Sequence, residues 1–433
     1  MVAFLAGIDI STLLFGSLVL LLSIGVPIAH ALGAATLLVV YAQGIPAVFV
    51  PQTTFNASDS FPLVAVPFFV LAGYLMEYGG ISQRLVDFAS ALIGHVTGGF
   101  ACVTILACMF FAAMSGSGPA TVAAIGTLMI PAMIRMGYDR PFAAAVSSTG
   151  GTLGIMIPPS NPMIIYGVVG NVSVTQLFIA GIVPGLLTGL VLIIGSWWLC
   201  RRYGFAGSSE APTARRLART FWHARWALLA PVVILGGIYG GICTPTEASV
   251  IAAFYGLLVG TFVYRKLTWR LVYRALYQSV LVGGTVTIIV GLASGFGRLL
   301  TQYQIPQQLT QAVLSVSQSW FVVLMIINIG LIIIGTFMET LATIVLLTPI
   351  LLPVVVALGV DPIHFGILLV ITSEIGFLTP PLGVNLFVAM GIANVSLEAI
   401  TRAVVPYLWM LFFMTLVLTA LPSISLWLPK LLR

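Results

Sequence analysis

The sequence predicts an all-α, polytopic membrane protein, and two observations lead to that prediction: its composition and its apolar runs. Of its 433 residues, 60% are hydrophobic and only 6% are charged, whereas a soluble domain carries about 25% charged residues. Apolar runs recur from end to end, and the longer ones can cross about 30 Å of hydrocarbon as helices. They span residues 13–29, 178–199, 228–239, 248–263, 276–293 and 404–421.

The distribution of Lys and Arg orients these predicted spans. The net charge of +6 does not indicate a nucleic-acid partner, because the basic residues collect in short segments between apolar runs, as on the cytoplasmic face of membrane proteins. Most lie in residues 201–226 and 264–274, which are therefore predicted to be cytoplasmic. Only Arg298, Lys430 and Arg433 are left facing outward, and the N-terminus is predicted to be periplasmic. No Lys or Arg precedes Arg84, so we expect no cleavable signal peptide.

The reactive residue types argue against an enzyme or a transition-metal site. The four Cys and four His do not cluster along the chain. No nucleophile is paired with a base and a third orienting group. The chain also lacks the G-x-x-x-x-G-K-[ST] motif of P-loop ATPases. The sequence therefore predicts a non-enzymatic membrane protein that needs no cofactor.

Residues 126–184 recur at an offset of 222 residues. Pro158–Pro159 recur as Pro380–Pro381, and Gly154 recurs as Gly376. A linker in the first copy carries Arg135 and Arg140, whereas the corresponding linker in the second copy carries no Lys or Arg. The two copies are therefore predicted to have opposite orientations in the membrane. Inverted repeats are typical of secondary transporters. We expect a first repeat at 1–225, which includes a cytoplasmic linker at 201–225, and a second repeat at 226–433.

Each copy contains two interrupted apolar segments. The first is a hairpin, at about 100–133 and about 320–357, whose halves are too short to cross the membrane and which is therefore predicted to be re-entrant. The second is a helix broken at Pro-Pro, at 141–173 and 362–394. Non-helical backbone survives at membrane depth only where it lines a cavity or is buried in protein. Freed carbonyls can bind a cation, and half-helix N-termini can hold an anion. The alternative is that the breaks are kinks that only shape packing.

Several polar residues outside the breaks have two possible roles. Glu339 and Glu374 are acids at membrane depth and are candidates for sodium or substrate handling; the alternative is a structural role such as capping a half-helix. Glu247 is predicted to cap a helix after an outward turn at 240–249. Arg298 could steer an anionic substrate or dock a partner, or snorkel to the interface. The amphipathic segments 81–95 and 265–279 are predicted to be interfacial arms that brace a mobile unit, or membrane-surface helices without that duty.

Five motifs resemble a known family, the large membrane subunit of tripartite ATP-independent periplasmic (TRAP) transporters of the C4-dicarboxylate and sialic-acid type. The resemblance covers nearly the whole chain. The motifs are FPLVAVPFFVLAGYLMEYGGI (61–81), SGSGPATVAAIGTLMIPAMIRMGYDRPFAAAV (115–146), GTLGIMIPPSNPMIIYGVV (151–169), GGIYGGICTPTEASV (236–250) and GFLTPPLGVNLFV (376–388).

The resemblance implies a function and a set of partners. It implies sodium-coupled import of a carboxylate-bearing solute across the bacterial inner membrane. It implies an elevator mechanism, in which hairpins and broken helices slide as one unit against a scaffold. It also implies a periplasmic substrate-binding protein and a small membrane subunit, which we expect to be a separate polypeptide here. Sodium ions would be the only bound ions.

The resemblance also implies site residues. The first sodium site is expected at the first tip and break, and the second, less certain in its residues, at the matching elements of copy two. The substrate carboxylate is expected between the tips. A competing role for each Ser or Thr is a hydrogen bond to the carbonyl four residues earlier in its own helix. The expected sodium ligands are Ser115, Gly151, Gly154, Ile157 and Pro159, then Thr340, Gly383 and Leu386; the expected substrate contacts are Ser117, Thr121, Ser160, Asn161, Glu339, Thr343 and Asn385.

Two other functions stay open at this point. One is an ion-coupled elevator symporter for organic anions that works alone, without a binding protein. The other is a membrane scaffold that transports nothing. The requirement for a periplasmic partner separates the first alternative from a TRAP permease, and a scaffold would not need matched breaks and tips.

Overall fold

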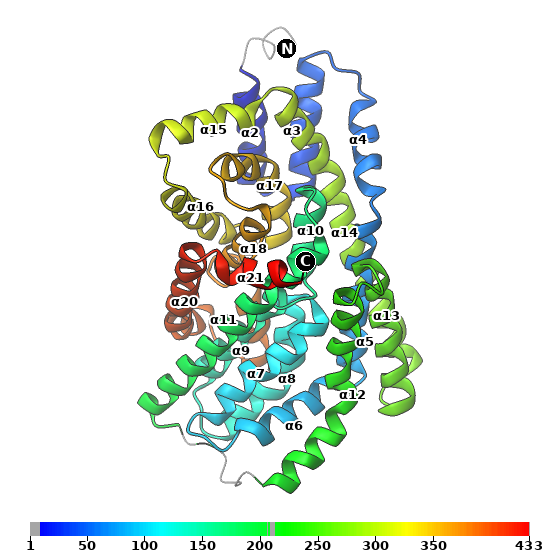
Figure 1. Cartoon of the computed structure of the whole chain (residues 1–433), viewed down its shortest axis with the longest axis vertical. Coiled ribbons are helices and arrows are strands. Elements are labelled where there is room, and N and C mark those ends of the chain that lie inside the picture. Colours follow the sequence, from blue (N-terminus) through cyan, green and yellow to red (C-terminus); the bar gives the residue numbers. More distant parts are fainter. Residues whose placement is uncertain (1–8, 206, 208–212, 433) are drawn as a thin grey trace.

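The computed structural model describes residues 9–205, 207 and 213–432 (Figure 1). Residues 1–8, on which the predicted orientation of the N-terminus falls, and residues 206 and 208–212 of the predicted linker lie outside the described residues. The described part is helical throughout. Its elements are α2 (Ile10–Ser23), α3 (Ile28–Ala42), α4 (Phe49–Ser58), η1 (Phe61–Val64), α5 (Ala65–Tyr78), α6 (Ile81–Ile93), α7 (Gly99–Ser115), α8 (Gly118–Arg135), α9 (Arg140–Met156), α10 (Asn161–Val169), α11 (Val174–Tyr203), α12 (Ala214–Tyr239), α13 (Pro245–Leu258), η2 (Val259–Val263), α14 (Trp269–Gln302), α15 (Ile305–Val316), α16 (Trp320–Gly335), α17 (Thr340–Ala357), α18 (Pro362–Phe377), α19 (Val384–Ala393), α20 (Leu397–Ala420) and α21 (Ser423–Leu431).

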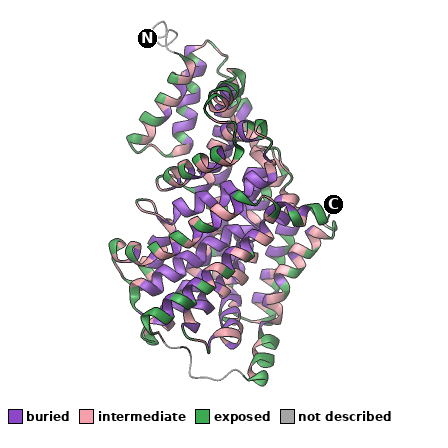
Figure 2. Ribbon diagram, turned by 60° about the vertical axis from the view of Figure 1, so that its left-hand side comes forward, coloured by how far each residue is buried: buried purple, intermediate pink, exposed green. Residues whose placement is uncertain are grey.

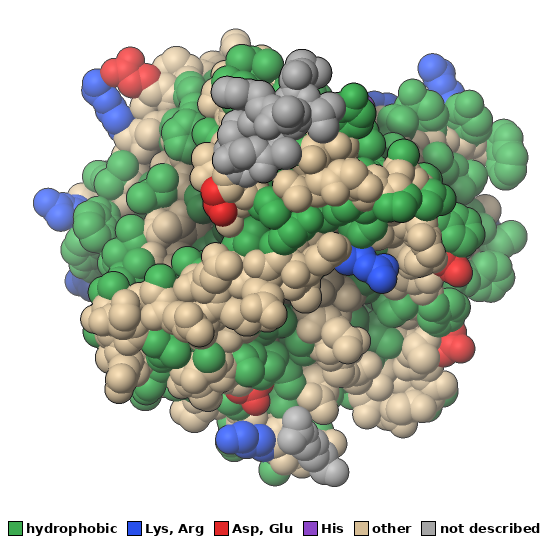
Figure 3. Space-filling view, turned by 90° about the horizontal axis from the view of Figure 1, so that it is seen from above, with side chains coloured by type: hydrophobic (Ala, Val, Ile, Leu, Met, Phe, Trp, Pro, Cys, Tyr) green, Lys and Arg blue, Asp and Glu red, His purple; other side chains and the backbone are tan. Residues whose placement is uncertain are grey.

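The helices confirm the predicted membrane class. Within the described residues, 8 helices are long and apolar enough to cross a membrane, or up to 10 if each bent pair counts as one span. Large apolar side chains point outward from them, such as Phe254, Trp269 and Val280, which are 60%, 82% and 68% exposed. Charged side chains are sparse and scattered on the end of the molecule seen in Figure 3. Such a surface suits a hydrocarbon solvent and would be unfavourable in water.

One predicted segment, the apolar run at the start of the chain, is wrong. The apolar run at 13–29 is not one helix, because α2 ends at Ser23 and α3 begins at Ile28. Gly25 between them has a φ of +84°, a conformation that glycine adopts without strain. In the predicted linker at 201–225, α11 runs to Tyr203 and α12 begins at Ala214, and its role as a linker stays a prediction. The error at 13–29 arises because hydropathy does not mark where a backbone turns.

The chain divides into an outer frame and an inner bundle. In the frame, α5 packs against α13 and α14, and α14 also packs against α3 and α4. These helices form the right-hand side of Figure 1. The inner bundle holds the hairpins and broken helices, and its two copies interlock: α19 packs against α8 and α9, and α10 packs against α17. Buried residues concentrate in this bundle (Figure 2).

The elements of the two copies match at the offset found in the sequence. Gly118 and Arg135 bound α8, and the residues 222 positions later, Thr340 and Ala357, bound α17. The broken helices α9–α10 and α18–α19 begin at Arg140 and Pro362, again 222 positions apart. The Pro158–Pro159 and Pro380–Pro381 peptide bonds are both cis. The division of the chain at 225/226 stays a prediction, although that point falls inside α12.

The two predicted interfacial arms form different kinds of helix, and their placement at the membrane interface stays a prediction. α6 forms a separate helix where the first was expected, but residues 269–279 of the second are the first part of the long helix α14. The element that matches α6 at the repeat offset is α15 instead. The amphipathic periodicity of residues 265–279 correctly predicted a helix there. It could not show that this helix continues into the apolar run at 276–293.

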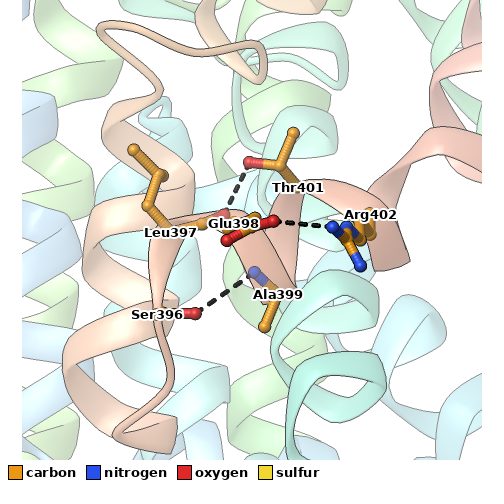
Figure 4. Close-up of polar contacts among 6 residues, drawn as sticks. All are labelled: Ser396, Leu397, Glu398, Ala399, Thr401 and Arg402. Atoms are coloured by element: carbon orange, nitrogen blue, oxygen red, sulfur yellow. Dashed lines mark hydrogen bonds and ion pairs between the residues drawn. The ribbon is translucent and has the colours of Figure 1, made fainter.

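Helix caps explain a polar motif that the copies share. Ser173 in GNVS and Ser396 in ANVS each accept a hydrogen bond from a backbone N–H three residues on, at the start of α11 and α20. In Figure 4, Ser396 bonds Ala399 in this way. The prediction for Glu247 is confirmed as well: Thr244 and Glu247 form a reciprocal capping box at the start of α13.

Candidate functional site

The first hairpin turns over two residues and is tied to the first break. α7 ends at Ser115 and α8 begins at Gly118. Gly116 between them has a φ of +61°, and a Cβ there would lie 3.1 Å from the Pro159 carbonyl oxygen. The Asn161 N–H donates to the Gly116 carbonyl oxygen at 3.2 Å. Only glycine allows this turn and this approach at once.

Hydroxyl groups and glycines line the first tip. The Ser115 and Thr121 hydroxyls lie 2.9 Å apart, and Thr121 donates to the Ser117 carbonyl oxygen at 2.8 Å. α9 meets the tip through Gly154, where a Cβ would lie 2.5 Å from both the Ser117 oxygen and Thr121 Oγ1. A Cβ at Gly151 would also collide with α8, at Val122. Four of the expected residues, Ser115, Thr121, Gly151 and Gly154, therefore lie on one packed surface.

The second hairpin repeats this tie with different side chains. The Leu382 N–H donates to the Thr336 carbonyl oxygen at 2.9 Å, which links the second tip to the second break. Gly383 takes a φ of +40° at the N-terminus of α19, where Leu386 packs against it. Thr343 donates to the Glu339 carbonyl oxygen at 3.0 Å. Thr121 and Thr343 thus both bond the carbonyl four residues earlier, which was the competing role for such residues.

Glu374 lies where the two copies meet. Its side chain is 1% exposed. Its Oε2 accepts a hydrogen bond from the Thr340 hydroxyl at 3.2 Å, and its Oε1 accepts one from Asn385 Nδ2 at 2.8 Å. On the other side, a Cβ on Gly118 would lie 2.6 Å from Oε1. Gly118 and Thr340 are the first residues of α8 and α17, so one carboxylate meets the start of an equivalent helix from each hairpin.

A cavity of about 660 Å³ lies between these tips and part of the frame. Its inner wall includes Ser115, Ser117, Asn161, Glu339, Thr340 and Glu374, and its outer wall includes Tyr74, Glu77, Tyr78, Arg274 and Gln278 of α5 and α14. Three carboxyl groups and one guanidinium therefore face a single space, which is large enough for a small organic solute.

The expected site residues divide between the cavity and the packed surface behind it. Ser115, Ser117, Asn161, Glu339 and Thr340 line the cavity. Most of the others are buried within the tips and breaks: Thr121, Gly151, Gly154, Ile157, Ser160, Gly383, Asn385 and Leu386. Thr343 is buried in α17, and Pro159 meets the first tip through its carbonyl group. The binding roles of all these residues stay predictions.

Glu339 and Arg298 each line a cavity. Glu339 precedes α17 but makes no capping hydrogen bond with its side chain, and it is exposed. Arg298 lines a second cavity, of about 760 Å³, together with Asp59 and Asn56. The Glu339 side chain therefore does not cap α17, whereas both roles considered for Arg298 stay predictions.

The frame wall was missed by the sequence analysis. Glu77 lies in an apolar span, so the rule that flagged Glu339 and Glu374 could have flagged it too. Arg274 was assigned to a cytoplasmic segment; it lies on α14, with its guanidinium carbon 5.9 Å from the centroid of the Tyr78 ring. Nothing in the local sequence indicates that α5 and α14 together face the hairpin tips.

Comparison with known proteins identifies related sequences. The model of the family described as "Tripartite ATP-independent periplasmic transporter, DctM component" matches residues 15–424. The isethionate TRAP transporter permease protein DctMQ of Oleidesulfovibrio alaskensis is 47% identical over 97% of this chain and 66% of its own length. The C4-dicarboxylate TRAP transporter large permease protein DctM of Vibrio cholerae is 40% identical over 97% of both chains. The sialic acid TRAP transporter large permease protein SiaM of the same organism is 38% identical over 96% and 98%.

Two solved transporters share the fold at low sequence identity. The YdaH transporter of Alcanivorax borkumensis has a TM-score of 0.66 with 15% identity over 87% of this chain and 88% of its own. MtrF of Neisseria gonorrhoeae has a TM-score of 0.60 with 14% identity over 86% and 84%. At these identities the likeness shows the fold alone.

Proposed function

This chain belongs to the DctM family of tripartite ATP-independent periplasmic transporters, and we propose that within it the chain carries a small organic anion across the inner membrane in symport with sodium. The observation that supports this proposal is the central cavity, where two tied tips, two broken helices and the frame face one another. A packing kink would not require an equivalent tip and break in each copy, tied in each by one backbone hydrogen bond.

The proposed substrate class is a carboxylate-bearing solute. The relatives are named for C4-dicarboxylates and sialic acid, which carry carboxylates, but also for isethionate, a sulfonate. We place the anion in the 660 Å³ cavity, beside Ser117 and Asn161 and near Arg274. Sodium would use the oxygen atoms of Ser115, Gly151, Gly154, Ile157 and Pro159 in the first copy and of Thr340, Gly383 and Leu386 in the second.

The proposed mechanism is an elevator. The hairpins and broken helices interlock across the copies, whereas the frame contacts them around a cavity, through α5 against α7 and α14 against α17. The inner bundle would slide past α5 and α14 and carry the anion and sodium between the two faces of the membrane. A small membrane subunit and a periplasmic binding protein are the proposed partners, and the N-terminus is proposed to be periplasmic.

Uptake into proteoliposomes tests this function. The chain would be reconstituted with its small subunit, and labelled succinate, isethionate or N-acetylneuraminate would be added with the cognate binding protein. We expect uptake of one of them under an inward sodium gradient and none under a matched potassium gradient. Equal uptake in both salts would contradict sodium coupling. Equal uptake without the binding protein would favour the stand-alone symporter, and no uptake of any organic anion would favour the scaffold.

A further inference from the structure

The cavity of about 760 Å³ that Arg298 lines, called the Arg298 cavity below, lies between the frame and the inner bundle. Its frame side is formed by α4, the turn into η1, and α14. Its inner side is formed by the end of α10 and the middle of α17. α10 follows the first break and α17 follows the second tip, so this cavity adjoins the same helices whose starts surround the central cavity.

Helix α14 passes three cavities in succession. Arg274 lines the central cavity and Arg298 lines the Arg298 cavity. Between them lies a smaller cavity of about 170 Å³, lined in part by Val286 of α14 and Leu341 of α17. The two arginines are separated by about 36 Å of helix at 1.5 Å per residue, which is close to the thickness of the hydrocarbon layer, about 30 Å. Each arginine therefore lies near one end of the part of α14 that crosses the membrane.

The guanidinium of Arg298 is available to a ligand. Among the described residues that line this cavity, Arg298 is the one basic side chain, and it is exposed. Asp59 lines the same cavity, yet within the described part of the chain the two side chains form no ion pair. A guanidinium presents several N–H donors in a planar fork that matches the oxygens of a carboxylate or a similar anion.

The rest of the lining suits a small solute with an anionic end and an apolar body. Asn56, Ser60 and Ser294 line the cavity, and their side chains make no hydrogen bond within the described residues, which leaves amide and hydroxyl donors free. Val168 of α10 and Val345 of α17 form part of an apolar wall. One charge, a few donors and apolar walls are typical of a site for a small molecule. Because the walls come from both the frame and the inner bundle, the space fits a solute better than the surface of a folded partner.

We propose that the Arg298 cavity is a transit site for a small organic anion, which Arg298 holds by its carboxylate or sulfonate at the opposite end of α14 from the central cavity. The proposal rests on the proposed function in taking the solute to be an organic anion. The charge distribution predicts that this end of α14 is the outer one, so the anion would occupy this site before the inner bundle takes it up. Asp59 keeps the binding weak through repulsion, as a site that must release its solute requires.

Protection of a cysteine in the Arg298 cavity tests the site without transport. Thr301→Cys places the reporter in the lining, at an exposed position whose hydroxyl already donates to the Gly297 carbonyl oxygen at 3.1 Å. Of the four native cysteines three are buried, and Cys243→Ser removes the half-buried one. The full-length chain with its small subunit would be placed in phosphatidylcholine nanodiscs, whose lipids carry no net charge, and labelled with an uncharged, hydrophilic maleimide. We expect succinate, isethionate or N-acetylneuraminate to slow labelling saturably, and the neutral succinamide to have no effect.

Variants with opposite expected effects assign the protection to this cavity. Arg298→Gln should weaken the apparent affinity of the protecting anion at least about tenfold, because a charge-assisted hydrogen bond is lost. Asp59→Asn should strengthen it by about twofold to fivefold, because a like charge is removed. Arg274→Gln is the matched control, since it changes the arginine of the central cavity, and it should keep the protection.

Three results would overturn the proposal. The first is that none of the three anions protects the reporter. The second is that Arg298→Gln and Asp59→Asn leave the protection unchanged, because Arg298 would then only snorkel to the interface. The third is that Arg274→Gln abolishes the protection, because the anion would then act from the central cavity. Protection that persists in a chain with no uptake of the same anion would count against the proposed symport and not against this site.

Discussion

The tip of the first hairpin is built from hydroxyls and glycines, whereas the tip of the second is built around carboxylates. Ser115, Thr121 and the Ser117 carbonyl satisfy one another at the first tip. At the second, Glu374 leaves an amide oxygen of Asn385 unpartnered, and Glu339 is exposed. The helices α8 and α17 that follow the two tips match residue for residue at their ends. Equivalent backbones therefore carry different chemistry, which indicates that the repeat conserves the shape of the site and the side chains divide its tasks.

The largest expected effect distinguishes backbone from side chain at the first tip. Ser115→Pro removes the N–H of the last residue of α7 and crowds the carbonyl four residues earlier, at a cost of about 3 kcal/mol or more. Ser115→Ala removes the hydroxyl contacts with Thr121 and, at 3.5 Å, with the Ser117 carbonyl oxygen, at about 1 kcal/mol. Thermal unfolding in detergent measures both. If the two substitutions had equal effects, the hydroxyl and not the backbone would define this tip.

A second prediction concerns the glycines at which tip and break cross in both copies. A Cβ at Gly154 would lie 2.5 Å from the Ser117 oxygen, and one at Gly376 would lie 2.6 Å from the Ile332 oxygen. Gly154→Ala and Gly376→Ala should each lower the unfolding free energy by about 1–3 kcal/mol through overpacking. Gly284→Ala in α14 is the control, since nothing lies within 4 Å of that position. If either alanine substitution left the unfolding free energy unchanged, the tip of that copy would not be packed tightly against its broken helix.

The hydroxyls at equivalent positions sharpen the comparison further. The Thr121 hydroxyl contacts both the Ser117 carbonyl oxygen and the Ser115 hydroxyl, whereas the Thr343 hydroxyl, within the described residues, donates to the Glu339 carbonyl oxygen alone. Thr121→Val should therefore destabilise the chain by about 1 kcal/mol more than Thr343→Val. Unfolding of the two variants under identical conditions would measure the difference, and a larger loss at Thr343 would reverse the assignment.

The smallest effect is expected at the ion pair that only the second copy has. Arg402 bonds Glu398 one turn earlier in α20 (Figure 4), and the two side chains are 80% and 75% exposed. The residues 222 positions earlier are Ala180 and Gln176. Arg402→Gln should change stability by less than about 0.5 kcal/mol, because an exposed pair gains little over hydration. A drop above 1 kcal/mol would mean that this pair helps to fix α20.

The sequence by itself determined the features that depend on neighbouring residues. Composition defined the membrane class, and matched prolines and glycines located both broken helices and both tips. The spacing of Thr244 and Glu247 alone indicated a helix cap, which the structure shows as a capping box. These signals are local, because proline lacks a backbone N–H in any structural context and a helix cap depends only on the first turn of its own helix.

Only the tertiary structure decided which distant residues share a space. It brought Glu374 of one copy to Gly118 of the other, and it placed Glu77 and Arg274 of the frame across a cavity from both tips. It also joined the segment 265–279 to α14. These contacts link residues tens to hundreds of positions apart. They depend on how whole helices pack, because the apolar pattern of a membrane helix does not say which face meets a partner and which meets lipid.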